Sequence, residues 1–384
     1  MRVLHVILSI DPRFGGLASC ATSLAAAQAH AGHDVAIAYH RTIAQEELFK
    51  VVRCNVDHVD ELRLADIPQD GPAERVLASG AAARLAGLVA QSDIVHLHGI
   101  WDPIIIRAGL IARRLNRPYV VSPHGMLNPW SLQQSRWRKR IMFALATDRV
   151  LRNSLFVHAL NPIEADAIGS ISDRYRVRIL PNGIFASRYA RLPAKGTFQA
   201  RHPELDKRRF ILFLGRLHHV KGLDFMAEAF SGFSREIGDV DLVVAGPDGG
   251  AREAFEQEIK RLNIEGRVHI VGPLYGDIKY AAMADAICLF QPSRQEGFSM
   301  SILEAMASGI PVVVSHNCHF PEVAAHQCGS VVPLDPTAMT KALVDIARDP
   351  LQAQAMGSAG HELALRDYTW DRIGERFIES YEDG

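Results

Sequence analysis

A loop in the second half of the chain carries two basic side chains, Arg216 and Lys221, among glycines. It follows the apolar run 210–214, which has the length and composition of a buried strand. Arginine and lysine on a loop between a strand and a helix hold phosphate groups through charge-assisted hydrogen bonds. We therefore interpret the pair as a site for a diphosphate, and favour this over a solvated basic turn.

Two glutamates, Glu296 and Glu304, flank a second loop, at which a helix is expected to begin. Ser299 can cap that helix, and Gly309 stops it. The main-chain amides of Phe298 and Ser299 at the helix start are donors for a phosphate. Apolar residues surround Glu304, so we expect a largely buried carboxylate with a bound partner rather than an exposed helix carboxylate. Both glutamates can then reach one ligand at the start of the helix.

A glycine pair in the first half, Gly15 and Gly16, follows the expected strand 3–8. A glycine turn before a helix lets main-chain N–H groups approach a phosphate. The chain contains neither the G-x-G-x-x-G dinucleotide motif nor the G-x-x-x-x-G-K-[ST] phosphate loop. Taken alone, the pair is better explained as a bare turn.

No motif indicates a metal or a cofactor. Asp239-Val240-Asp241 imitates a D-x-D metal motif, but it precedes an expected strand, whereas ligand-binding residues of open α/β sheets follow strands. We interpret it as the entry to that strand. The chain has no H-E-x-x-H and no Cys/His ligand set, and most of its 17 histidines are expected to be surface or packing residues. We therefore expect no metal, no cofactor and metal-independent activity.

The composition excludes several other classes of protein. The 42 basic and 43 acidic side chains give a net charge of -1, so no global charge attracts nucleic acid. The five cysteines lie far apart and form no C-x-x-C pair, which suits a reducing compartment. No apolar run approaches the roughly 18 residues of a membrane-spanning helix. These features favour a cytoplasmic protein.

Short apolar or β-branched runs alternate with longer amphipathic stretches as far as about residue 332, which is the pattern of repeated βαβ units. Two series of parallel strands, each doubly wound, predict an α/β protein with two Rossmann-like domains that face a central cleft. The glycines and charged residues described above follow expected strands, where such sheets bind ligands. The expected strands are 3–8, 35–39, 94–97, 119–122, 155–159 and 177–180, and then 210–214, 242–245, 268–271, 286–290 and 312–315.

The domain boundaries follow from these two series. We expect a first domain over residues 1–185, a linker rich in Arg, Lys, Pro and Ala over 186–208, and a second domain over 209–369. In the last segment, 370–384, Ile373, Phe377 and Tyr381 recur at fourfold spacing, which predicts an amphipathic helix. From its residues alone, this helix could pack on either domain.

Two features of the first domain are of the kind that contact sugars or membranes. Trp101, Trp130 and Trp137 lie in or after expected loops, where their rings either stack on sugar faces or pack as core or lid residues. The segment 136–143 mixes a basic cluster with apolar side chains, as interfacial membrane helices do, although a solvated helix face is the slightly favoured interpretation. A membrane contact there would hold the protein peripherally at the anionic inner face of the plasma membrane.

The segment from Glu296 to Val313 resembles the E-x₇-E signature of family 4 glycosyltransferases, a retaining group with the GT-B architecture. Weaker motifs support the resemblance in the same order along nearly the whole chain: Gly15-Gly16, Pro123-His124-Gly125, Leu180-Pro181-Asn182-Gly183, Gly215-Arg216-Leu217 and Lys221-Gly222. The resemblance also implies that the terminal helix crosses back onto the first domain.

The resemblance implies a role for each site residue. Arg216 and Lys221 would stabilise the diphosphate leaving group. His124 would lie near the anomeric carbon, Glu296 would contact the donor sugar, and Glu304 would bind the ribose hydroxyls. The donor phosphates would also meet main-chain groups of the opposite domain and of the second loop, namely Gly15, Gly16, Gly297, Phe298 and Ser299.

These observations predict a glycosyltransferase that moves a sugar from a nucleotide-sugar to a glycan or lipid-linked glycan with retention of configuration, in cell-envelope or exopolysaccharide synthesis. Trp101 and Trp130 are the candidate acceptor contacts. The acceptor is expected to attack from the face of the leaving group, with Glu296 as a covalent nucleophile the weaker alternative. A nucleotide-sugar epimerase or sugar phosphorylase of the same fold, or a non-catalytic sugar-binding scaffold, are the rival functions.

Overall fold

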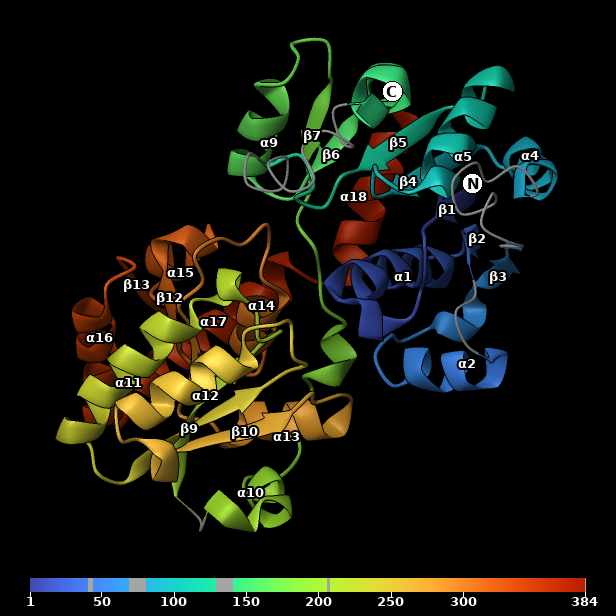
Figure 1. Cartoon of the computed structure of the whole chain (residues 1–384). Helices are drawn as coiled ribbons and strands as arrows, with labels where there is room; N and C mark the ends of the chain where they lie inside the picture. The colour runs from blue at the N-terminus through green and yellow to red at the C-terminus, as the bar shows by residue number, and fades with distance from the viewer. Residues whose placement is uncertain (41–43, 69–80, 129–140, 206–207, 384) are drawn as a thin grey trace. The chain divides into compact units, whose positions relative to one another are not determined.

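The computed structural model describes residues 1–40, 44–68, 81–128, 141–205 and 208–383. The chain forms two compact units, each of which is described by itself (Figure 1). Unit 1 comprises Met1–Gly183 together with Trp370–Gly384, and unit 2 comprises Ile184–Thr369. None of the helices in the described ranges combines the length and the apolar character that a membrane span requires.

In the described part of unit 1, a seven-stranded parallel sheet has the order β3-β2-β1-β4-β5-β6-β7. One face carries an apolar core against α4, α5 and α8, to which Leu4 and Val6 contribute. His5 lies between these two residues, so its side chain points to the opposite face, toward α1. The strands are β1 (Arg2–Val6), β2 (Asp34–Tyr39), β3 (Arg63–Asp66), β4 (Ile94–His98), β5 (Tyr119–Ser122), β6 (Val157–Ala159) and β7 (Val177–Ile179). The helices are α1 (Gly16–His30), α2 (Gln45–Arg53), α4 (Ala81–Gln91), α5 (Pro103–Arg114), α8 (Asp148–Arg152), α9 (Pro162–Gly169) and α18 (Trp370–Glu382), with a π-helical turn at Phe143–Thr147.

Unit 2 contains, within its described residues, a six-stranded parallel sheet in the order β10-β9-β8-β11-β12-β13. Alternate strand residues face opposite cores: Phe210 and Leu212 pack with α13, α14 and α17, whereas Ile211 and Phe213 pack with α11, α12 and α16. The strands are β8 (Arg209–Leu214), β9 (Val240–Ala245), β10 (Val268–Gly272), β11 (Cys288–Gln291), β12 (Val312–Ser315) and β13 (Gly329–Val332). The helices are α10 (Thr197–Arg201), α11 (Leu223–Glu236), α12 (Arg252–Arg261), α13 (Asp277–Asp285), α14 (Met300–Ala307), α15 (Glu322–Ala325), α16 (Pro336–Arg348) and α17 (Pro350–Asp367). The fold class expected from the sequence, two doubly wound α/β sheets, is confirmed.

The segment 186–208, which we expected to be a linker, is instead part of unit 2. Phe198 and Leu205 are completely buried in its core. The carboxylate of Asp285 on α13 accepts hydrogen bonds from the main-chain N–H groups of Gly196 (2.5 Å), Phe198 (2.9 Å) and Gln199 (3.3 Å), and so satisfies the N-terminus of α10. Two buried apolar side chains and one capping carboxylate thus attach a segment that has no regular hydrophobic period.

The terminal helix α18 belongs to unit 1. Its Ile373, Phe377 and Tyr381 are buried, as their spacing predicts. Gly374 lies against α1, because a Cβ atom at this glycine would lie 3.5 Å from the Cβ of Ala27. The helix therefore covers the same face of the sheet to which His5 points.

Candidate active site

The loops that follow β8 and β11 meet in unit 2 and bring two of the expected site residues together. Nζ of Lys221 lies 2.6 Å from Oε1 of Glu296, although the residues are 75 positions apart. They meet because β8 and β11 are neighbours in the sheet. The approach requires glycine at position 222, where φ is 68° and a Cβ atom would lie 2.0 Å from the carbonyl oxygen of Pro292.

One oxygen of the Glu296 carboxylate is heavily engaged and the other is open. Oε1 accepts hydrogen bonds from Ser293 Oγ (2.6 Å) and Gln291 Nε2 (3.2 Å) as well as from Lys221. Among the residues that the structure describes, none donates to Oε2. The glutamate is thus held firmly through one oxygen, while the second remains available to a hydroxyl group of a ligand.

Arg216 presents an uncompensated positive charge next to this pair of loops. Its side chain is exposed and, within the described ranges, makes no hydrogen bond or ion pair. Its aliphatic stem passes the loop after β9, since a Cβ atom at Gly249 would lie 2.7 Å from Cγ of Arg216. Burial lowers the pKa of His218, and the charges of Arg216 and Lys221 lower it further. The electrostatics therefore favour an anion at this loop.

The start of α14 differs in one respect from the expectation. Ser299 occupies the N-cap position, but its side chain makes no capping hydrogen bond and instead lies 3.1 Å from the Oγ of Ser301. The first-turn amides consequently lack an acceptor within the helix or from the cap. The ring of Phe298 packs on Phe320 and Tyr368, with centroids 5.3 and 6.3 Å away, so this residue can offer a ligand only its main chain.

Glu304 has a partner that the sequence analysis missed. Oε1 of Glu304 on α14 lies 2.8 Å from Nζ of Lys279 on α13, and both side chains are largely buried, with 16 and 14% exposed. Burial lowers the pKa of Lys279, but the charge and hydrogen bond of Glu304 outweigh it and leave the pKa raised. Lys279 follows β10, so its position after a strand was the only available signal.

In unit 1, the glycine pair opens α1 as the sequence suggested. Gly15 has a φ of 111°, which only glycine adopts without strain, and Gly16 is the first residue of α1. A Cβ atom on either glycine would have no neighbour within 4 Å, and no side chain caps the helix. Among the described residues, the space beside both glycines is therefore open, as the approach of an anion to this helix start requires.

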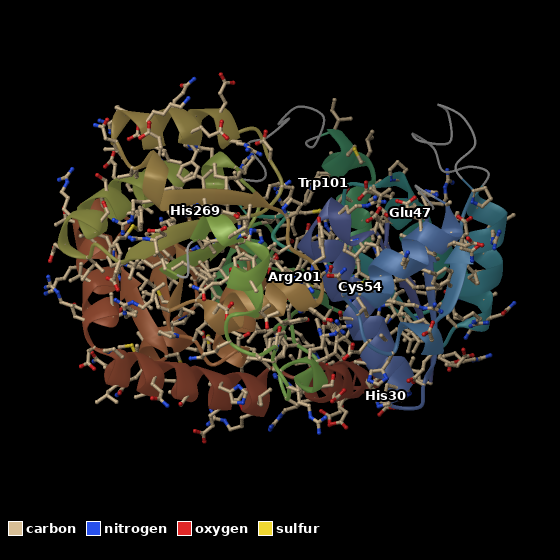
Figure 2. The ribbon with its side chains drawn as sticks, turned by 90° about the horizontal axis from the view of Figure 1, so that it is seen from below. His30, Glu47, Cys54, Trp101, Arg201 and His269 are labelled. Carbon is tan, nitrogen blue, oxygen red and sulfur yellow. The ribbon has the colours of Figure 1, made fainter. Side chains whose placement is uncertain are left out.

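His124 follows β5 and also has an unusual backbone. Its φ is 51°, and its Nε2 lies 3.1 Å from Nδ1 of His98 on β4. Trp101, labelled in Figure 2, is partly buried and packs near the ring of Phe143, with centroids 6.5 Å apart. Trp130, Trp137 and the basic residues 136–140 lie outside the described residues, so their roles stay predictions.

The segment Asp239-Val240-Asp241 contributes a buried carboxylate to a group of ion pairs and hydrogen bonds. Asp239 precedes β9, and Asp241 is buried within the strand, where its carboxylate contacts Arg208 Nε (2.9 Å), Arg267 Nε (2.6 Å) and His269 Nε2 (2.9 Å). His269 is labelled in Figure 2. Three partners neutralise this carboxylate, which agrees with its interpretation as a strand-entry feature.

Two groups in unit 1 place three possible metal-binding atoms within 4.8 Å of one another. Exposed His30 and half-buried His58 lie beside Glu61, and the two histidine rings stack with centroids 3.6 Å apart. The second group, His5, His96 and His98, is buried. Sequence analysis missed both, because their members come from separate elements and have no motif spacing.

The buried histidines of unit 1 should make this unit less stable as the pH falls. Burial lowers the pKa of His5 and His158 to about 4 and that of His124 to about 3, and it also lowers those of His96 and His98. The unfolded chain therefore binds protons below about pH 6.5 while the folded unit does not. The free energy of unfolding should fall from pH 6.5 toward pH 4, by about 1.4 kcal/mol per pH unit for each such histidine.

Urea unfolding followed by tryptophan fluorescence measures this effect, because Trp101, Trp130, Trp137 and Trp370 all belong to unit 1. The variant His326→Gln, at an exposed position of unit 2, is the control and should show the same slope as the parent protein. A free energy of unfolding that stays constant between pH 6.5 and 4 would contradict the burial of neutral histidines.

Comparison with known proteins places the chain in a family. Residues 15–183 match the model of the glycosyl transferase 4-like domain, and residues 195–363 match that of glycosyl transferases group 1. A GDP-mannose-dependent α-(1-6)-phosphatidylinositol monomannoside mannosyltransferase of Mycolicibacterium smegmatis is 29% identical over 78% of this chain and 79% of its own. A GDP-mannose:cellobiosyl-diphosphopolyprenol α-mannosyltransferase of Xanthomonas campestris is 24% identical over 99 and 96% of the two chains.

The fold has close counterparts among solved structures. The Anabaena protein HepE, solved with UDP and glucose, superposes with a TM-score of 0.81 at 17% identity, and the match covers 100% of both chains. The two family models together span most of each unit. The chain therefore belongs to the glycosyltransferase group 1 family, also called family 4, and has the GT-B fold.

Proposed function

We propose that this glycosyltransferase moves a sugar from a nucleoside-diphosphate sugar to a glycan or lipid-linked glycan, with retention of the anomeric configuration and without a metal. The observation that carries the proposal is the pair formed by Lys221 and Glu296, 2.6 Å apart, beside the exposed charge of Arg216. A cation and a carboxylate with a free oxygen are the two groups that a departing diphosphate and a sugar need.

The chemistry follows from the charges. Breaking the glycosyl–phosphate bond leaves negative charge on the diphosphate and positive charge on the sugar, so fixed cations beside the former lower the barrier. Lys221 can transfer its hydrogen bond from Glu296 to a phosphate oxygen, because Ser293 and Gln291 continue to satisfy Oε1 of the carboxylate. Oε2 of Glu296 can then accept a hydrogen bond from a hydroxyl group of the donor sugar.

The relatives narrow the choice of substrates. Both of the mannosyltransferases described above carry GDP-mannose in their names, and one acts on a diphosphopolyprenol and the other on a phosphatidylinositol derivative. We take GDP-mannose as the donor and a lipid-linked glycan as the acceptor. The likeness to HepE supports the fold alone, so its bound UDP carries no weight in this choice.

A donor panel tests the proposal. The purified chain is incubated with GDP-mannose, UDP-glucose or UDP-N-acetylglucosamine and with a polyprenyl-diphosphate glycan, and the linkage of the product is read by NMR. We expect an α-mannosyl product from GDP-mannose. Epimerised donor without acceptor, a sugar phosphate formed only with added phosphate, or tight binding without turnover would each identify one of the rival functions.

Removal of metal ions is expected to leave transfer unchanged, because Arg216 and Lys221 can meet the charge of the diphosphate and the D-x-D imitation is occupied by protein groups. Initial rates are measured with excess EDTA and again after addition of Mg²⁺ or Mn²⁺. Transfer that disappears with EDTA and returns with the divalent ion would show that a metal takes part.

A further inference from the structure

A continuous chain of hydrogen bonds runs through the interior of unit 1 and ends at His124. We call it the histidine chain. It links elements on the sheet face that α1 and α18 cover. Its members are, in order, the carbonyl group of Leu180, His158, Ser122, His96, Tyr381, Gln28, His5, His98 and His124.

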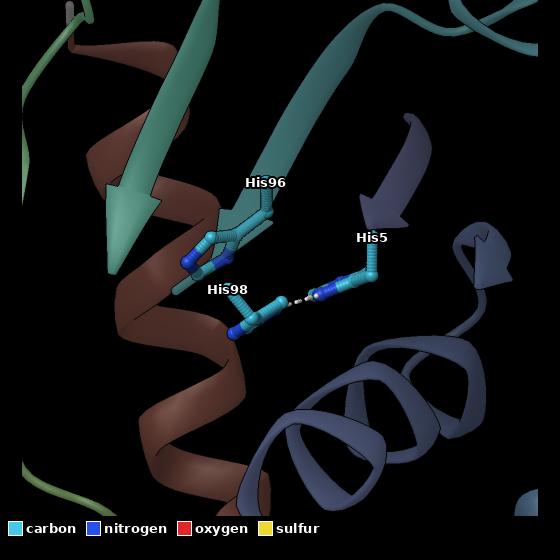
Figure 3. A group of neighbouring side chains, drawn as sticks. All are labelled: His5, His96 and His98. Carbon is cyan, nitrogen blue, oxygen red and sulfur yellow. Dashed lines mark hydrogen bonds between the residues drawn. The ribbon is translucent and has the colours of Figure 1, made fainter. Parts of the chain in front are cut away.

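The sheet places the members next to one another. His5 on β1 is in register with His96 on β4, and His98 on β4 is in register with Ser122 at the end of β5. Residues two apart in a strand point to the same face, which explains why His96 and His98 lie together. Figure 3 shows His5 on one strand and the other two on its neighbour, with the hydrogen bond between His5 and His98 dashed.

The first half of the histidine chain runs from the carbonyl group of Leu180 to Tyr381 on the terminal helix. Nε2 of His158 lies 2.6 Å from the carbonyl oxygen of Leu180, and its Nδ1 lies 2.7 Å from Oγ of Ser122. The same Oγ lies 2.6 Å from Nε2 of His96, whose Nδ1 lies 2.7 Å from the hydroxyl group of Tyr381.

The second half of the histidine chain runs from the hydroxyl group of Tyr381 to His124. Nε2 of Gln28 donates to the Tyr381 hydroxyl at 3.3 Å, and its Oε1 lies 2.8 Å from Nε2 of His5. Nδ1 of His5 lies 2.8 Å from Nε2 of His98, and Nδ1 of His98 lies 3.1 Å from Nε2 of His124. Within the described residues, Nδ1 of His124 has no hydrogen-bond partner.

Each of the five histidines in the histidine chain is neutral near pH 7. Desolvation lowers the pKa of each ring well below its ordinary value, to about 4 for His5 and His158. No carboxylate is among the members of the histidine chain, so a proton on one of these rings would have no counter-charge there to offset the cost of desolvation. Each neutral ring therefore offers one donor and one acceptor.

The carbonyl group of Leu180 then sets the direction of every hydrogen bond, because a carbonyl oxygen only accepts. His158 must donate from Nε2, so Ser122 donates to its Nδ1. The hydroxyl hydrogen of Ser122 is then already donated, so Ser122 can only accept a hydrogen bond from His96. His96 therefore donates from Nε2 and accepts from Tyr381 at Nδ1. Gln28 must then donate to the tyrosine oxygen, which also fixes the orientation of its amide. The same order continues through His5 and His98, which both donate from Nε2 and accept at Nδ1. The rule ends at His124, which donates from Nε2 and keeps an unprotonated Nδ1.

The same rule excludes a metal at the buried group His5, His96 and His98, whose nitrogens lie within 4.8 Å of one another. A metal ion needs an unshared lone pair on each ligand. Here each ring has one nitrogen that donates a proton and one whose lone pair already accepts a hydrogen bond. The group is better explained as a part of the histidine chain.

The main chain at His124 is held independently. The carboxylate of buried Glu164 accepts hydrogen bonds from the N–H groups of Gly125 (2.6 Å) and Leu160 (2.9 Å). It thereby fixes the loop in which His124 has its left-handed backbone, with φ of 51°. The loop positions the ring, and the histidine chain decides which of its nitrogens carries the proton.

We propose that Tyr381 and Ser122 are positioning residues that fix His124 as the tautomer protonated on Nε2, so that its Nδ1 accepts a hydrogen bond from a hydroxyl group of the donor sugar. The role of the tautomer in transfer rests on the proposed function, whereas the tautomer itself does not. A neutral acceptor also suits this position, because a cation would oppose the positive charge that develops on the sugar.

The test uses Tyr381→Phe in the full chain, with Tyr119→Phe as its matched control. Tyr119 is also buried in unit 1, but its hydroxyl group donates to the carbonyl oxygen of Val150 outside the histidine chain. Without the Tyr381 hydroxyl, Gln28 can turn its amide over and His5, His98 and His124 can all reverse. His158 and His96 stay fixed, because Ser122 still links them to Leu180.

Long-range ¹H–¹⁵N correlation spectra of the imidazole rings report the tautomers. We expect all five rings of the parent protein to be protonated on Nε2, and Tyr381→Phe to give an Nδ1–H form of His124 while His158 and His96 are unchanged. Tyr119→Phe should leave all five unchanged. A parent protein with His124 protonated on Nδ1 would overturn the proposal, even if the variant failed to fold. Unaltered signals in folded Tyr381→Phe would overturn it as well.

Kinetics separate the positioning role from a merely structural one. Tyr381→Phe should lower kcat about fivefold, the factor that the net loss of one hydrogen bond typically gives, with KM for the donor nearly unchanged. A parental kcat combined with a reversed tautomer would show that His124 does not act through Nδ1. If no donor in the panel is turned over, the proposed function fails, while the spectra still decide the tautomer.

Discussion

Lys221→Ala is expected to lower kcat by about two to three orders of magnitude, the loss seen when one preorganised charge-stabilising group is removed from an active site. The lysine is poised by its ion pair with Glu296 at 2.6 Å, and its side chain is only 20% exposed. A cation in a partly desolvated position interacts more strongly with a developing negative charge than a fully solvated cation does. Turnover should therefore suffer more than donor affinity.

The variant is not expected to unfold unit 2. Oε1 of Glu296 retains its hydrogen bonds from Ser293 and Gln291, so its carboxylate does not become a bare buried charge. Lys260→Ala on exposed α12 is the matched control and should behave like the parent protein. Steady-state rates and calorimetry with the nucleoside diphosphate make the comparison. Rates for Lys221→Ala within about threefold of the parent would rule out this role for the lysine.

Glu296→Gln and Glu304→Gln should fail in different ways, and the pairs seen in the structure sharpen the contrast. Glu296→Gln removes the charge that neutralises Lys221 in the free protein, so free nucleoside diphosphate should bind as well as before or more tightly. Turnover should fall about a hundredfold, because a neutral amide stabilises the developing charge on the sugar less well.

Glu304→Gln should instead weaken nucleotide binding, by about tenfold for a lost charge-assisted contact, and change kcat little. It also leaves Lys279 partly buried without its counter-charge, so the free energy of unfolding of unit 2 should fall by about 1–3 kcal/mol. The double variant Glu304→Gln, Lys279→Met separates the two effects, because it should regain stability but not nucleotide affinity.

Calorimetry with free nucleoside diphosphate and steady-state kinetics decide between the two assignments. Loss of nucleotide binding in Glu296→Gln, with normal binding in Glu304→Gln, would show that the two roles are reversed. Equal loss of kcat and affinity in both variants would mean that the loop after β11 acts as a single unit.

Much of the fold could be predicted because buried parallel strands are continuous apolar runs that end at turns. Each of the expected strands overlaps a strand of the structure. The two strands that were missed, β3 (Arg63–Asp66) and β13 (Gly329–Val332), are both edge strands. Their residues are mostly half-buried, so selection for apolar side chains is weak and the pattern is lost. The expected linker failed for a related reason, since isolated Phe198 and Leu205 attach it without any periodicity.

The sequence could predict that Lys221, Glu296 and His124 follow strands, but it could not predict the pairs between residues of the candidate site. Lys221 meets Glu296 because β8 and β11 are adjacent, and strand order is a property of the whole sheet. Lys279 had no motif, and only the packing of α13 beside α14 assigns it to Glu304. Ser299 looked like a helix cap, yet the local geometry turns its hydroxyl group toward Ser301.

The residues of the chain by themselves determined the alternating elements, the two doubly wound halves, the loops that carry charge and the amphipathic character of the terminal helix. They did not determine where that helix packs, since its apolar stripe fits any apolar surface. Only the tertiary structure places Tyr381 beside His96 and Gln28 in unit 1. That placement turns scattered histidines into one directed chain, because the direction of a hydrogen bond depends on every neighbour between it and the carbonyl group where the chain begins.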